Sequence, residues 1–315
     1  MMLNYGLCKP VGLHLMPPTV FLVLSPLCLS IGSVLAKGLI AGGLPFSIAE
    51  IGPLAFLTFQ LIGSLIFLGS VIAARSQRVT IGTAWPLLTI AGAILGLGSI
   101  GTVMALVFMP VGEASVIWAM QPLAMIVLAW LLLKEATPLP TILLCIVGIG
   151  GVVLIVTSGV QGTAENRLLG SIFAGGTALS AAAYTVWMRQ ISRSVDPFSA
   201  LIVVQASTLV VASCAWAVAA NTGLVTGTSP GWWDALAAMT TGAIYYGLAY
   251  SLFLLGLHQI EAGKAGMFLN LVPVFTILLA LLVLGERLSY VQWVGSAVVV
   301  VAVSLAGWMN RQPAR

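Results

Sequence analysis

The sequence predicts an all-α integral membrane protein in which ten transmembrane helices form two inverted repeats of five helices each. The first observation is the amino-acid composition: 60% of the 315 residues are hydrophobic and only 6% are charged. A soluble domain typically has about a quarter of its residues charged, so this chain lacks the side chains to cover a surface in water. The second observation is a series of long apolar runs, and the third is an internal repeat. A β-barrel is excluded because its strands would show short alternating segments instead of continuous runs.

The apolar runs define the helices in order. A helix of about 20 residues crosses the roughly 30 Å hydrocarbon core of a bilayer, and each run approaches that length. The first five runs lie at 18–36, 52–73, 86–108, 112–133 and 141–157. The second five lie at 168–188, 198–220, 235–257, 264–284 and 290–308. The predicted units are therefore a first repeat at 18–157 and a second at 168–308, flanked by terminal segments 1–17 and 309–315.

The positive charges predict the orientation of these helices. With ten spans both termini lie on one side, which collects nine of the twelve cations: Lys9, Arg75, Arg78, Lys134, Arg189, Arg193, Lys264, Arg311 and Arg315. The other side holds only Lys37, Arg167 and Arg287. Because cations favour cytoplasmic loops, both terminal segments are expected in the cytoplasm, with the chain in a bacterial inner membrane. The net charge of +4 comes from cations that lie between the apolar runs and are explained by the orientation of the helices, so the charge does not indicate a nucleic-acid partner.

The internal repeat relates the two halves of the chain. The tripeptide Pro45-Phe46-Ser47 recurs 152 residues later as Pro197-Phe198-Ser199. At an offset of 151, five further positions recur: Gly112, Ala114, Pro122, Ala129 and Glu135 match Gly263, Ala265, Pro273, Ala280 and Glu286. Each half holds an odd number of spans, so the second copy enters the membrane from the opposite side. Inverted repeats of this kind are the architecture of alternating-access carriers, whose substrate site lies near mid-membrane between the halves.

The fourth and ninth runs carry a family resemblance. Both begin at a small residue, contain a mid-helix proline and end at a glutamate, from Gly112 to Glu135 and from Gly263 to Glu286. In these features, and in the Q-W-V-G of Gln292 to Gly295, the chain resembles the drug/metabolite transporter superfamily in its ten-helix form of two EamA-type units. The resemblance covers nearly the whole chain and implies a carrier of small organic solutes, often an exporter of amino acids or other metabolites. The nearest branch is that of the aromatic amino acid exporters. Lys134-Glu135 departs from the family's usual Gly-Glu.

Motifs for other functions fail on their context. Gly96, Gly98 and Gly101 form a G-x-G-x-x-G, but the motif lies within a span and no strand precedes it, so close helix packing or a flexible point in the helix explains it better than dinucleotide binding. A membrane-embedded enzyme acting on lipid-linked substrates would need Ser229, Asp234, His258 and Glu261, which the predicted topology places on opposite sides of the membrane. No P-loop motif occurs, so ATP is not the energy source. No cofactor is predicted, and the scarcity of acidic residues argues against a metal site or metal-ion transport.

Polar and aromatic residues deep in the spans are the candidates for a substrate cavity. Three pairs share a helix face by their spacing of three or four residues: Trp118 with Gln121, Tyr184 with Trp187, and Tyr246 with Tyr250. Gln60, Asn270 and Lys264 add two amides and a cation. Ordinary packing between helices remains an alternative for each of these residues, because membrane amides seek protein partners. Tyr245 and Trp233 are expected at the membrane interface, where aromatic side chains gather.

Charged residues near helix ends have two interpretations. Lys37, Glu113, His258, Glu261 and Lys264 are functional candidates because charge inside a membrane is costly, but each lies close to a predicted helix end, where a side chain can reach water or cap the helix. Glu135 and Glu286 recur in both repeats at the ends of helices, which indicates anchoring of a turn.

Pro122 and Pro273 lie at matched depth in the two repeats. A proline inside a helix removes one backbone hydrogen bond, here to the carbonyl of Trp118 or of Leu269. The prolines therefore predict either hinges that open backbone groups toward a central site or static kinks.

These observations predict a secondary transporter that moves a small neutral or zwitterionic metabolite by alternating access, with export of amino acids favoured. A multidrug or other metabolite carrier of the same family is the alternative. The expected partners are this small-molecule substrate and the lipid bilayer. Small-residue faces at 38–42 and 148–151 suit packing within one chain or between copies in a homo-oligomer.

Overall fold

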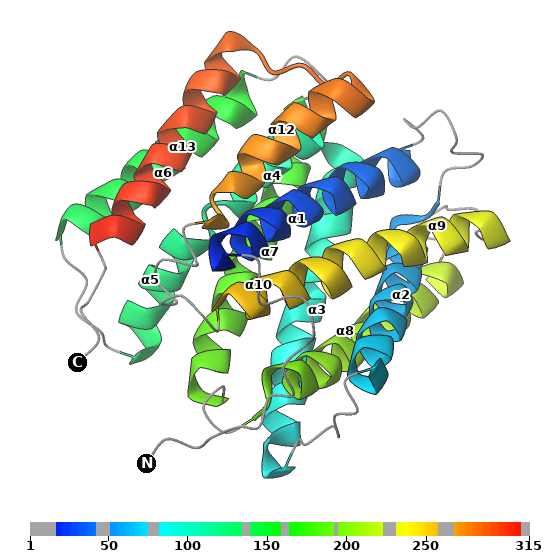
Figure 1. Ribbon diagram of the computed structural model, residues 1–315. Helices are drawn as coiled ribbons and strands as arrows, with labels where there is room; N and C mark the ends of the chain where they lie inside the picture. The colour runs from blue at the N-terminus through cyan, green and yellow to red at the C-terminus, as the bar shows by residue number, and fades with distance from the viewer. Residues whose placement is uncertain are drawn as a thin grey trace.

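The computed structural model describes residues 17–41, 51–74, 82–133, 139–158, 164–191, 195–222, 231–257 and 268–309. These residues form an all-α bundle, which confirms the predicted fold class (Figure 1). Five helices are long and apolar enough to cross a membrane: Thr19–Ala41, Pro53–Ala74, Gly82–Phe108, Asn166–Met188 and Phe198–Thr222. Shorter apolar helices cover Ile142–Thr157, Leu271–Leu284 and Tyr290–Leu305. The chain is therefore built as a multi-pass membrane protein.

The described residues of the first repeat form six α-helices. They are α1 (Pro18–Ala41), α2 (Pro53–Ala74), α3 (Trp85–Phe108), α4 (Val111–Trp118), α5 (Gln121–Leu133) and α6 (Leu139–Thr157), with a short 3-10 helix η2 (Gly82–Ala84) before α3. The fourth predicted span is thus divided into α4 and α5. The division falls directly before Pro122, which cannot donate the backbone hydrogen bond that would continue α4.

The second repeat is divided at the corresponding place and at one further place. Its helices are α7 (Ala164–Ile191), α8 (Pro197–Thr222), α9 (Trp232–Gly242), η3 (Ala243–Ala249), α10 (Tyr250–Leu257), α12 (Leu271–Leu284) and α13 (Tyr290–Met309). The segment η3 is a π-helix that joins α9 to α10 within the eighth predicted span. In the ninth predicted span, α12 begins at Leu271, so that Pro273 lies in its first turn, as Pro122 does in α5.

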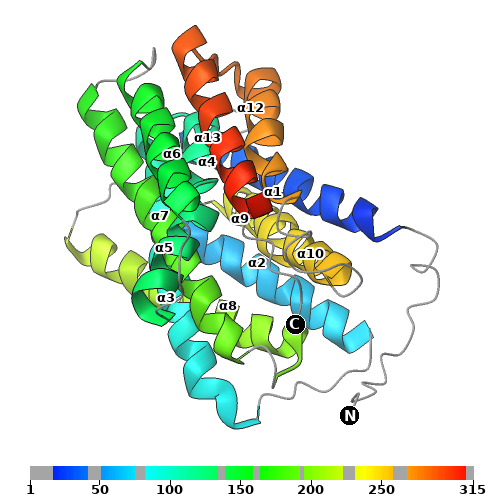
Figure 2. The ribbon, with the colours of Figure 1, turned by 90° about the vertical axis from the view of Figure 1, so that its left-hand side faces the viewer.

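The two repeats interlock. In the first repeat, α3 packs against α7 and α8 of the second, α2 against α8 and α9, and α1 against α12, η3 and α10. Figures 1 and 2 show α6 and α13, one from each repeat, side by side at one edge of the bundle. Most of the packing of each repeat is therefore with the other one.

Glycines allow the closest of these approaches. The backbone of Met239 lies against Gly63, and the backbone of Gln60 lies against Gly242, so that α2 and α9 cross with their main chains in contact. On α3, a Cβ atom at Gly98 would lie 2.8 Å from the Cβ of Ser180, and one at Gly101 would lie 2.8 Å from Oγ1 of Thr177. Small residues at such crossings let membrane helices approach, because van der Waals contact replaces the hydrophobic effect in lipid.

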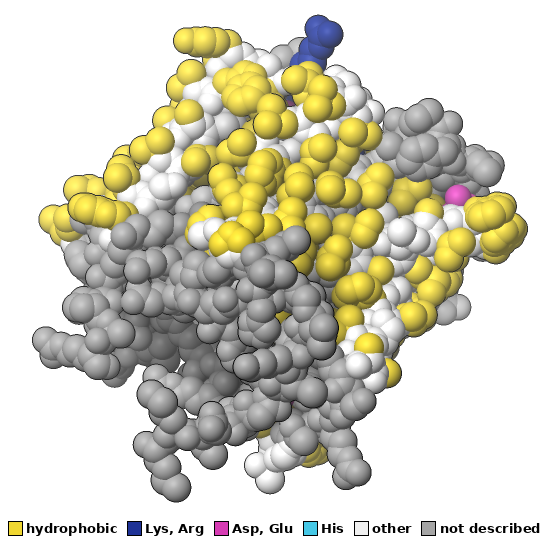
Figure 3. Space-filling model, viewed as in Figure 1, with side chains coloured by type: hydrophobic (Ala, Val, Ile, Leu, Met, Phe, Trp, Pro, Cys, Tyr) yellow, Lys and Arg dark blue, Asp and Glu magenta, His cyan; other side chains and the backbone are white. Residues whose placement is uncertain are grey.

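The outer surface of the described residues is largely apolar. In Figure 3, hydrophobic side chains spread over the described part of the visible face, on which few charged side chains are seen. Leu282 is 79% exposed and Trp232 is 66% exposed, which a water-soluble protein would rarely permit over so wide an area. This surface suits contact with lipid.

Tyr245 differs from its predicted place at the membrane interface. Its ring packs against Gly32 of α1 in the interior. A Cβ atom added at Gly32 would lie only 2.7 Å from the Cβ of Tyr245. The missing side chain at Gly32 provides the room for the ring. Trp233, predicted for the same interface, is 56% exposed near the start of α9.

Candidate functional site

A small cavity lies between the two repeats. We call it the inter-repeat cavity, and it is lined by Gly32, Ser33 and Ala36 of α1, Gln60 of α2, Thr102, Val103 and Leu106 of α3, and Tyr245 and Tyr246 of η3. Its volume of about 10 Å³ leaves room for roughly one water molecule. Its lining combines hydroxyl groups, an amide and two aromatic rings and contains no charged side chain. The arrangement can offer hydrogen bonds and stacking to a neutral group.

Two consecutive tyrosines of the π-helix η3, Tyr245 and Tyr246, line this cavity. The backbone hydrogen bonds of a π-helix join residues five apart instead of four, and such segments are frequent at functional sites. The ring centroids of Tyr245 and Tyr246 are 4.7 Å apart, and that of Tyr250 is 6.1 Å from that of Tyr246. The structure therefore brings together Tyr246, Tyr250 and Gln60 of the predicted candidates and adds Tyr245.

Side chains from both repeats fix the position of this aromatic group. The hydroxyl of Tyr246 donates to the hydroxyl of Ser99 on α3 over 2.9 Å. The amide of Gln205 on α8 donates to the backbone carbonyl of Tyr246 over 3.0 Å, and its oxygen accepts a hydrogen bond from Ser64 on α2. These hydrogen bonds lie between helices in the buried interior of the bundle, where an unpaired polar group would be costly.

Trp118 and Gln121 flank the interruption between α4 and α5. The indole nitrogen of Trp118 is buried and has no hydrogen-bond partner within the described part of the chain. The amide of Gln121 lies 3.4 Å from the hydroxyl of Thr185 on α7. In the other repeat, Asn270 occupies the N-cap position of α12, and its amide lies 3.4 Å from the hydroxyl of Ser304. These residues stand at matched helix interruptions, outside the lining of the inter-repeat cavity.

Tyr184 and Trp187 have structural contacts. Both pack into a cluster that α7 forms with α3 and α8, around Leu88 and Val204. The indole N–H of Trp187 donates to the backbone carbonyl of Leu87 over 3.1 Å. Their role in binding a substrate stays a prediction, as do the hinge roles of Gly96, Gly98, Gly101, Pro122 and Pro273.

Other candidates lie outside the described residues. Lys264, His258, Glu261 and Glu135 all fall in ranges that the structure does not describe. Of the residues considered for an enzyme, the described one is Asp234, whose carboxylate caps α9 by accepting a hydrogen bond from the backbone N–H of Gly231 over 3.1 Å. Within the described ranges, no group of three metal-ligating side chains comes together.

A second polar feature lies where α1 and α3 end and α4, α7 and α13 begin. We call it the end cluster, and it consists of Lys37, Glu113, Arg167, Glu286 and Gln292. Glu113 is 2% exposed, and one of its oxygens accepts a hydrogen bond of 2.6 Å from the amide of Gln292. Its other oxygen lies 3.6 Å from Nε of Arg167, which is 4% exposed.

The other half of the end cluster joins helix termini. The ammonium group of Lys37 donates to the backbone carbonyls of Leu106 and Met109, at the C-terminal end of α3, over 2.5 and 3.2 Å. The carboxylate of Glu286, in the connection between α12 and α13, accepts hydrogen bonds of 3.1 and 3.2 Å from the N–H groups of Val111 and Gly112 at the start of α4. Each charge therefore lies at the helix end whose dipole it complements.

The environment of Glu286 shifts its acidity. Burial raises the pKa of its carboxyl above the usual value, whereas the two N–H groups of α4 and the cation of Lys37 act in the opposite direction. The sequence predicts that Glu286 anchors a turn, and in the structure its carboxylate caps the first turn of α4, a helix of the other repeat.

Sequence reasoning missed two members of the end cluster. The sequence predicts Arg167 as a loop cation near the start of a span, and it marks Gln292 only as part of a family motif. A glutamine within an apolar run is a signal that it has a polar partner, but only the fold shows that the partner is Glu113 of the other repeat.

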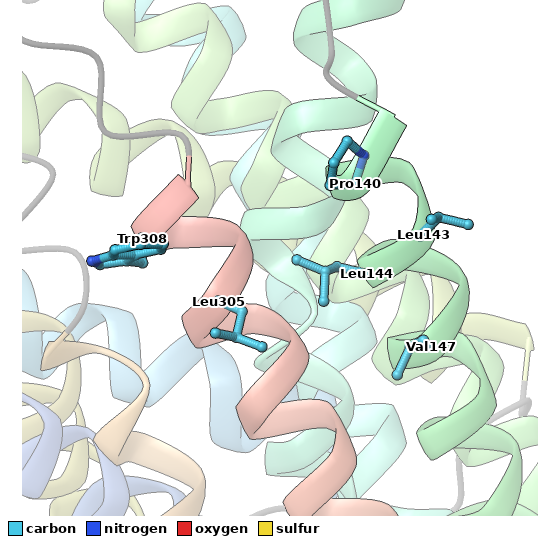
Figure 4. Close-up of a pocket in the computed structure, with 6 residues that line it drawn as sticks. All are labelled: Pro140, Leu143, Leu144, Val147, Leu305 and Trp308. Atoms are coloured by element: carbon cyan, nitrogen blue, oxygen red, sulfur yellow. The ribbon is translucent and has the colours of Figure 1, made fainter.

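An apolar groove of about 300 Å³ lies on the outside of the bundle between α6 and α13 (Figure 4). Its lining is entirely hydrophobic: Pro140, Leu143, Leu144, Val147, Leu305 and Trp308. The side chains of Leu143 and Trp308 are 54% and 61% exposed. Hydrocarbon fits such a groove, which offers nothing to orient a polar solute.

Comparison with known proteins gives three findings. The sequence model of the EamA-like transporter family matches residues 17–157 and 168–308. No curated protein matches the chain. Among solved structures 26 chains match, and one of them, titled only as the crystal structure of a protein, has a TM-score of 0.62 at 20% sequence identity, over 93% of this chain and 97% of that chain. At this identity the similarity concerns the fold alone.

Proposed function

Because the chain belongs to the EamA-like transporter family of the drug/metabolite transporter superfamily, whose members are small-molecule transporters, we propose that it is a secondary carrier that exports neutral amino acids. Transport proceeds by alternating access and without ATP, since the sequence contains no P-loop. In the proposed orientation the chain lies in a bacterial inner membrane with both termini in the cytoplasm.

The lining of the inter-repeat cavity is the observation that carries this proposal. Gln60, Ser33 and Thr102 offer an amide and two hydroxyl groups, and Tyr245 and Tyr246 offer aromatic faces. Uncharged hydrogen-bonding groups next to aromatic rings suit a solute with an apolar side chain and no net charge. A cationic drug would lack a carboxylate partner among the lining residues.

The small volume of the cavity supports a cycle of closed and open states. Ligand pockets usually measure about 300–1,000 Å³, whereas this cavity measures about 10 Å³. A substrate can enter only when the helices that meet there move apart. The cavity lies between α1, α2 and α3 of one repeat and η3 of the other, so a movement of the repeats against each other enlarges it.

Two predicted candidates complete the proposed recognition of an amino acid. Lys264 is proposed to meet the substrate carboxylate, on the sequence argument that this cation lies near a span. The buried indole N–H of Trp118, which has no partner among the described residues, is proposed to donate a hydrogen bond when the substrate is bound. An unpaired buried donor carries a cost that a ligand can relieve.

Counterflow in proteoliposomes tests the proposal. Purified protein is reconstituted with an excess of unlabelled solute inside, and uptake of labelled phenylalanine, threonine or a cationic drug is followed. Saturable exchange of an amino acid is expected, and Lys264→Ala should abolish it. Exchange of the drug alone would replace the proposal with multidrug transport, and exchange of neither class would overturn it.

Matched variants localise the binding site. Thr102→Val removes a hydroxyl from the cavity and should weaken apparent affinity about fivefold, the effect of one hydrogen bond. Thr89→Val on the same helix is the control, because Thr89 is exposed and, like Thr102, bonds back to the carbonyl four residues earlier. Trp118→Phe is compared in the same way with Trp130→Phe, since Trp130 is 53% exposed. Equal effects of each variant and its control would place the site elsewhere.

A further inference from the structure

The end cluster lies directly beside the inter-repeat cavity. On α1, Lys37 is one helical turn beyond Ser33, which lines the cavity. On α3, the carbonyl that accepts from Lys37 belongs to Leu106, which also lines the cavity. The cluster therefore lies between the cavity and the end of the bundle at which α1 ends and α13 begins. We call this end the cluster face.

The contacts of Glu113 and Glu286 in the end cluster join the two repeats, whereas the hydrogen bonds of Lys37 lie within the first repeat. Lys37 and Glu113 belong to the first repeat, and Arg167, Glu286 and Gln292 belong to the second. Both the ion pair of Glu113 with Arg167 and its hydrogen bond with Gln292 join the repeats. The carboxylate of Glu286 likewise joins the second repeat to the first two N–H groups of α4.

Such contacts hold the repeats together at the cluster face. Charges removed from water must be paired, and separating one partner from a buried pair is strongly unfavourable unless water or another partner replaces it. If the repeats moved apart at this face, water would have to enter and hydrate Glu113 and Arg167. The same movement that opens a path to the cavity would thus break these contacts.

One oxygen of Glu113 is only weakly paired. Among the described residues Oε2 of Glu113 accepts no hydrogen bond, and its 3.6 Å separation from Nε of Arg167 is longer than the roughly 2.7–2.9 Å of a charge-assisted hydrogen bond. The other oxygen of Glu113 accepts from the neutral amide of Gln292. A buried charge pair with one unsatisfied oxygen opposes opening less than a fully bonded pair does. When the pair opens, water can form the hydrogen bond that this oxygen lacks in the buried state, which offsets part of the cost of separating the charges.

We propose that the end cluster is the gate of this carrier at the cluster face, closed in the present structure and opened once in each transport cycle. This inference rests on the proposed function as an alternating-access carrier. The gating residues are Glu113, Arg167 and Gln292, and the helix-end contacts of Lys37 and Glu286 hold α3 and α4 in the closed arrangement.

Thiol accessibility tests the gate without any knowledge of the substrate. Ala36, which is small, 4% exposed and lines the cavity, is changed to cysteine in a chain whose native cysteines are replaced by alanine. Right-side-out and inside-out membrane vesicles then present each face separately to a membrane-impermeant maleimide. Labelling through the cluster face is expected to be slow, and Glu113→Gln or Arg167→Met should raise its rate at least about tenfold, since loss of the pair shifts the population toward the open state.

Arg287→Met is the matched control. Arg287 is an exposed cation next to Glu286, at the same end of the bundle, and has no ion pair among the described residues. Its substitution should leave the labelling rate within about twofold of the parent. The gate is overturned if neither Glu113→Gln nor Arg167→Met raises labelling while both elute as monodisperse protein, or if Arg287→Met raises it equally. Glu113→Gln preserves the volume of the side chain, so it remains informative if Arg167→Met fails to fold.

The two proposals fail separately. If labelling rises as expected but no amino acid exchanges in proteoliposomes, the gate stands and the substrate is wrong. If an amino acid exchanges but labelling is unchanged in both variants, the transport function stands and the end cluster is a static contact.

Discussion

Tyr246 and Ser99 join the two repeats through one buried hydrogen bond, in which the phenol of the π-helix η3 donates to a serine of α3 over 2.9 Å. Tyr246→Phe removes the donor and keeps the ring. We expect the free energy of unfolding to fall by about 1 kcal/mol, the usual net contribution of such a bond. Thermal unfolding in detergent measures it, with Tyr290→Phe as the control because Tyr290 is 84% exposed. Equal melting temperatures of the two variants would contradict this role.

The crossing of α2 and α9 depends on a missing side chain. A Cβ at Gly63 would overlap the backbone of Met239, which cannot move aside as a flexible side chain can. Gly63→Ala should therefore destabilise the protein by about 1–3 kcal/mol or more. Gly69→Ala on the same helix is the control, since no atom lies within 4 Å of its built Cβ, and alanine there favours the helix. A melting temperature of Gly63→Ala at or above that of Gly69→Ala would refute the close crossing.

The pH dependence of stability should change in Glu286→Gln. Burial raises the pKa of this carboxyl above its value of 4.5 in an unfolded chain, so the folded protein binds the proton more readily than the unfolded chain does. The stability that Glu286 contributes relative to glutamine is then full below that value and is lost as the pH rises through the raised pKa. Melting temperatures of the two proteins, compared from about pH 4 to pH 8, should show the wild-type advantage shrinking. A constant difference would contradict the raised pKa.

Gly285 ends α12 in a left-handed conformation with φ +66°. The backbone N–H of Glu286 then bonds back to the carbonyl of Ala280, so this turn directs the chain into the end cluster. Gly285→Ala should cost about 1–2 kcal/mol, because a Cβ clashes with the backbone in that conformation. Gly150→Ala in α6 serves as the control, with open space at its built Cβ. Thermal unfolding of both variants in detergent measures the difference, and no loss at Gly285 would argue against the turn.

The sequence predicts the helices of this fold because their cause is local. Runs of apolar residues long enough for a bilayer require helices, since a backbone in lipid must satisfy its own hydrogen bonds. The interruptions are also local in part, because Pro122 and Pro273 remove an N–H each. The π-helix at 243–249 has no such mark, since nothing in its sequence differs from an ordinary membrane helix.

The partners of side chains could not be predicted in the same way. Tyr245 lies inside because Gly32, more than 200 positions earlier, leaves room for its ring. Arg167 and Gln292 meet Glu113 because three helix ends coincide in space. Distances along the chain do not determine such meetings. The repeat predicts that the halves correspond, but the contacts between them depend on how they pack.

The interlocked packing of the repeats has a consequence for how the protein is made. The glycines of α3 pack against α7 and α8, and Gly63 of α2 packs against α9. These later helices have not yet been synthesised when the first five spans enter the membrane. Until the second half is inserted, the small-residue faces of the first half therefore contact lipid instead of their partner helices. Its folding is completed only when the later helices arrive, which makes assembly of this protein a late, whole-chain event.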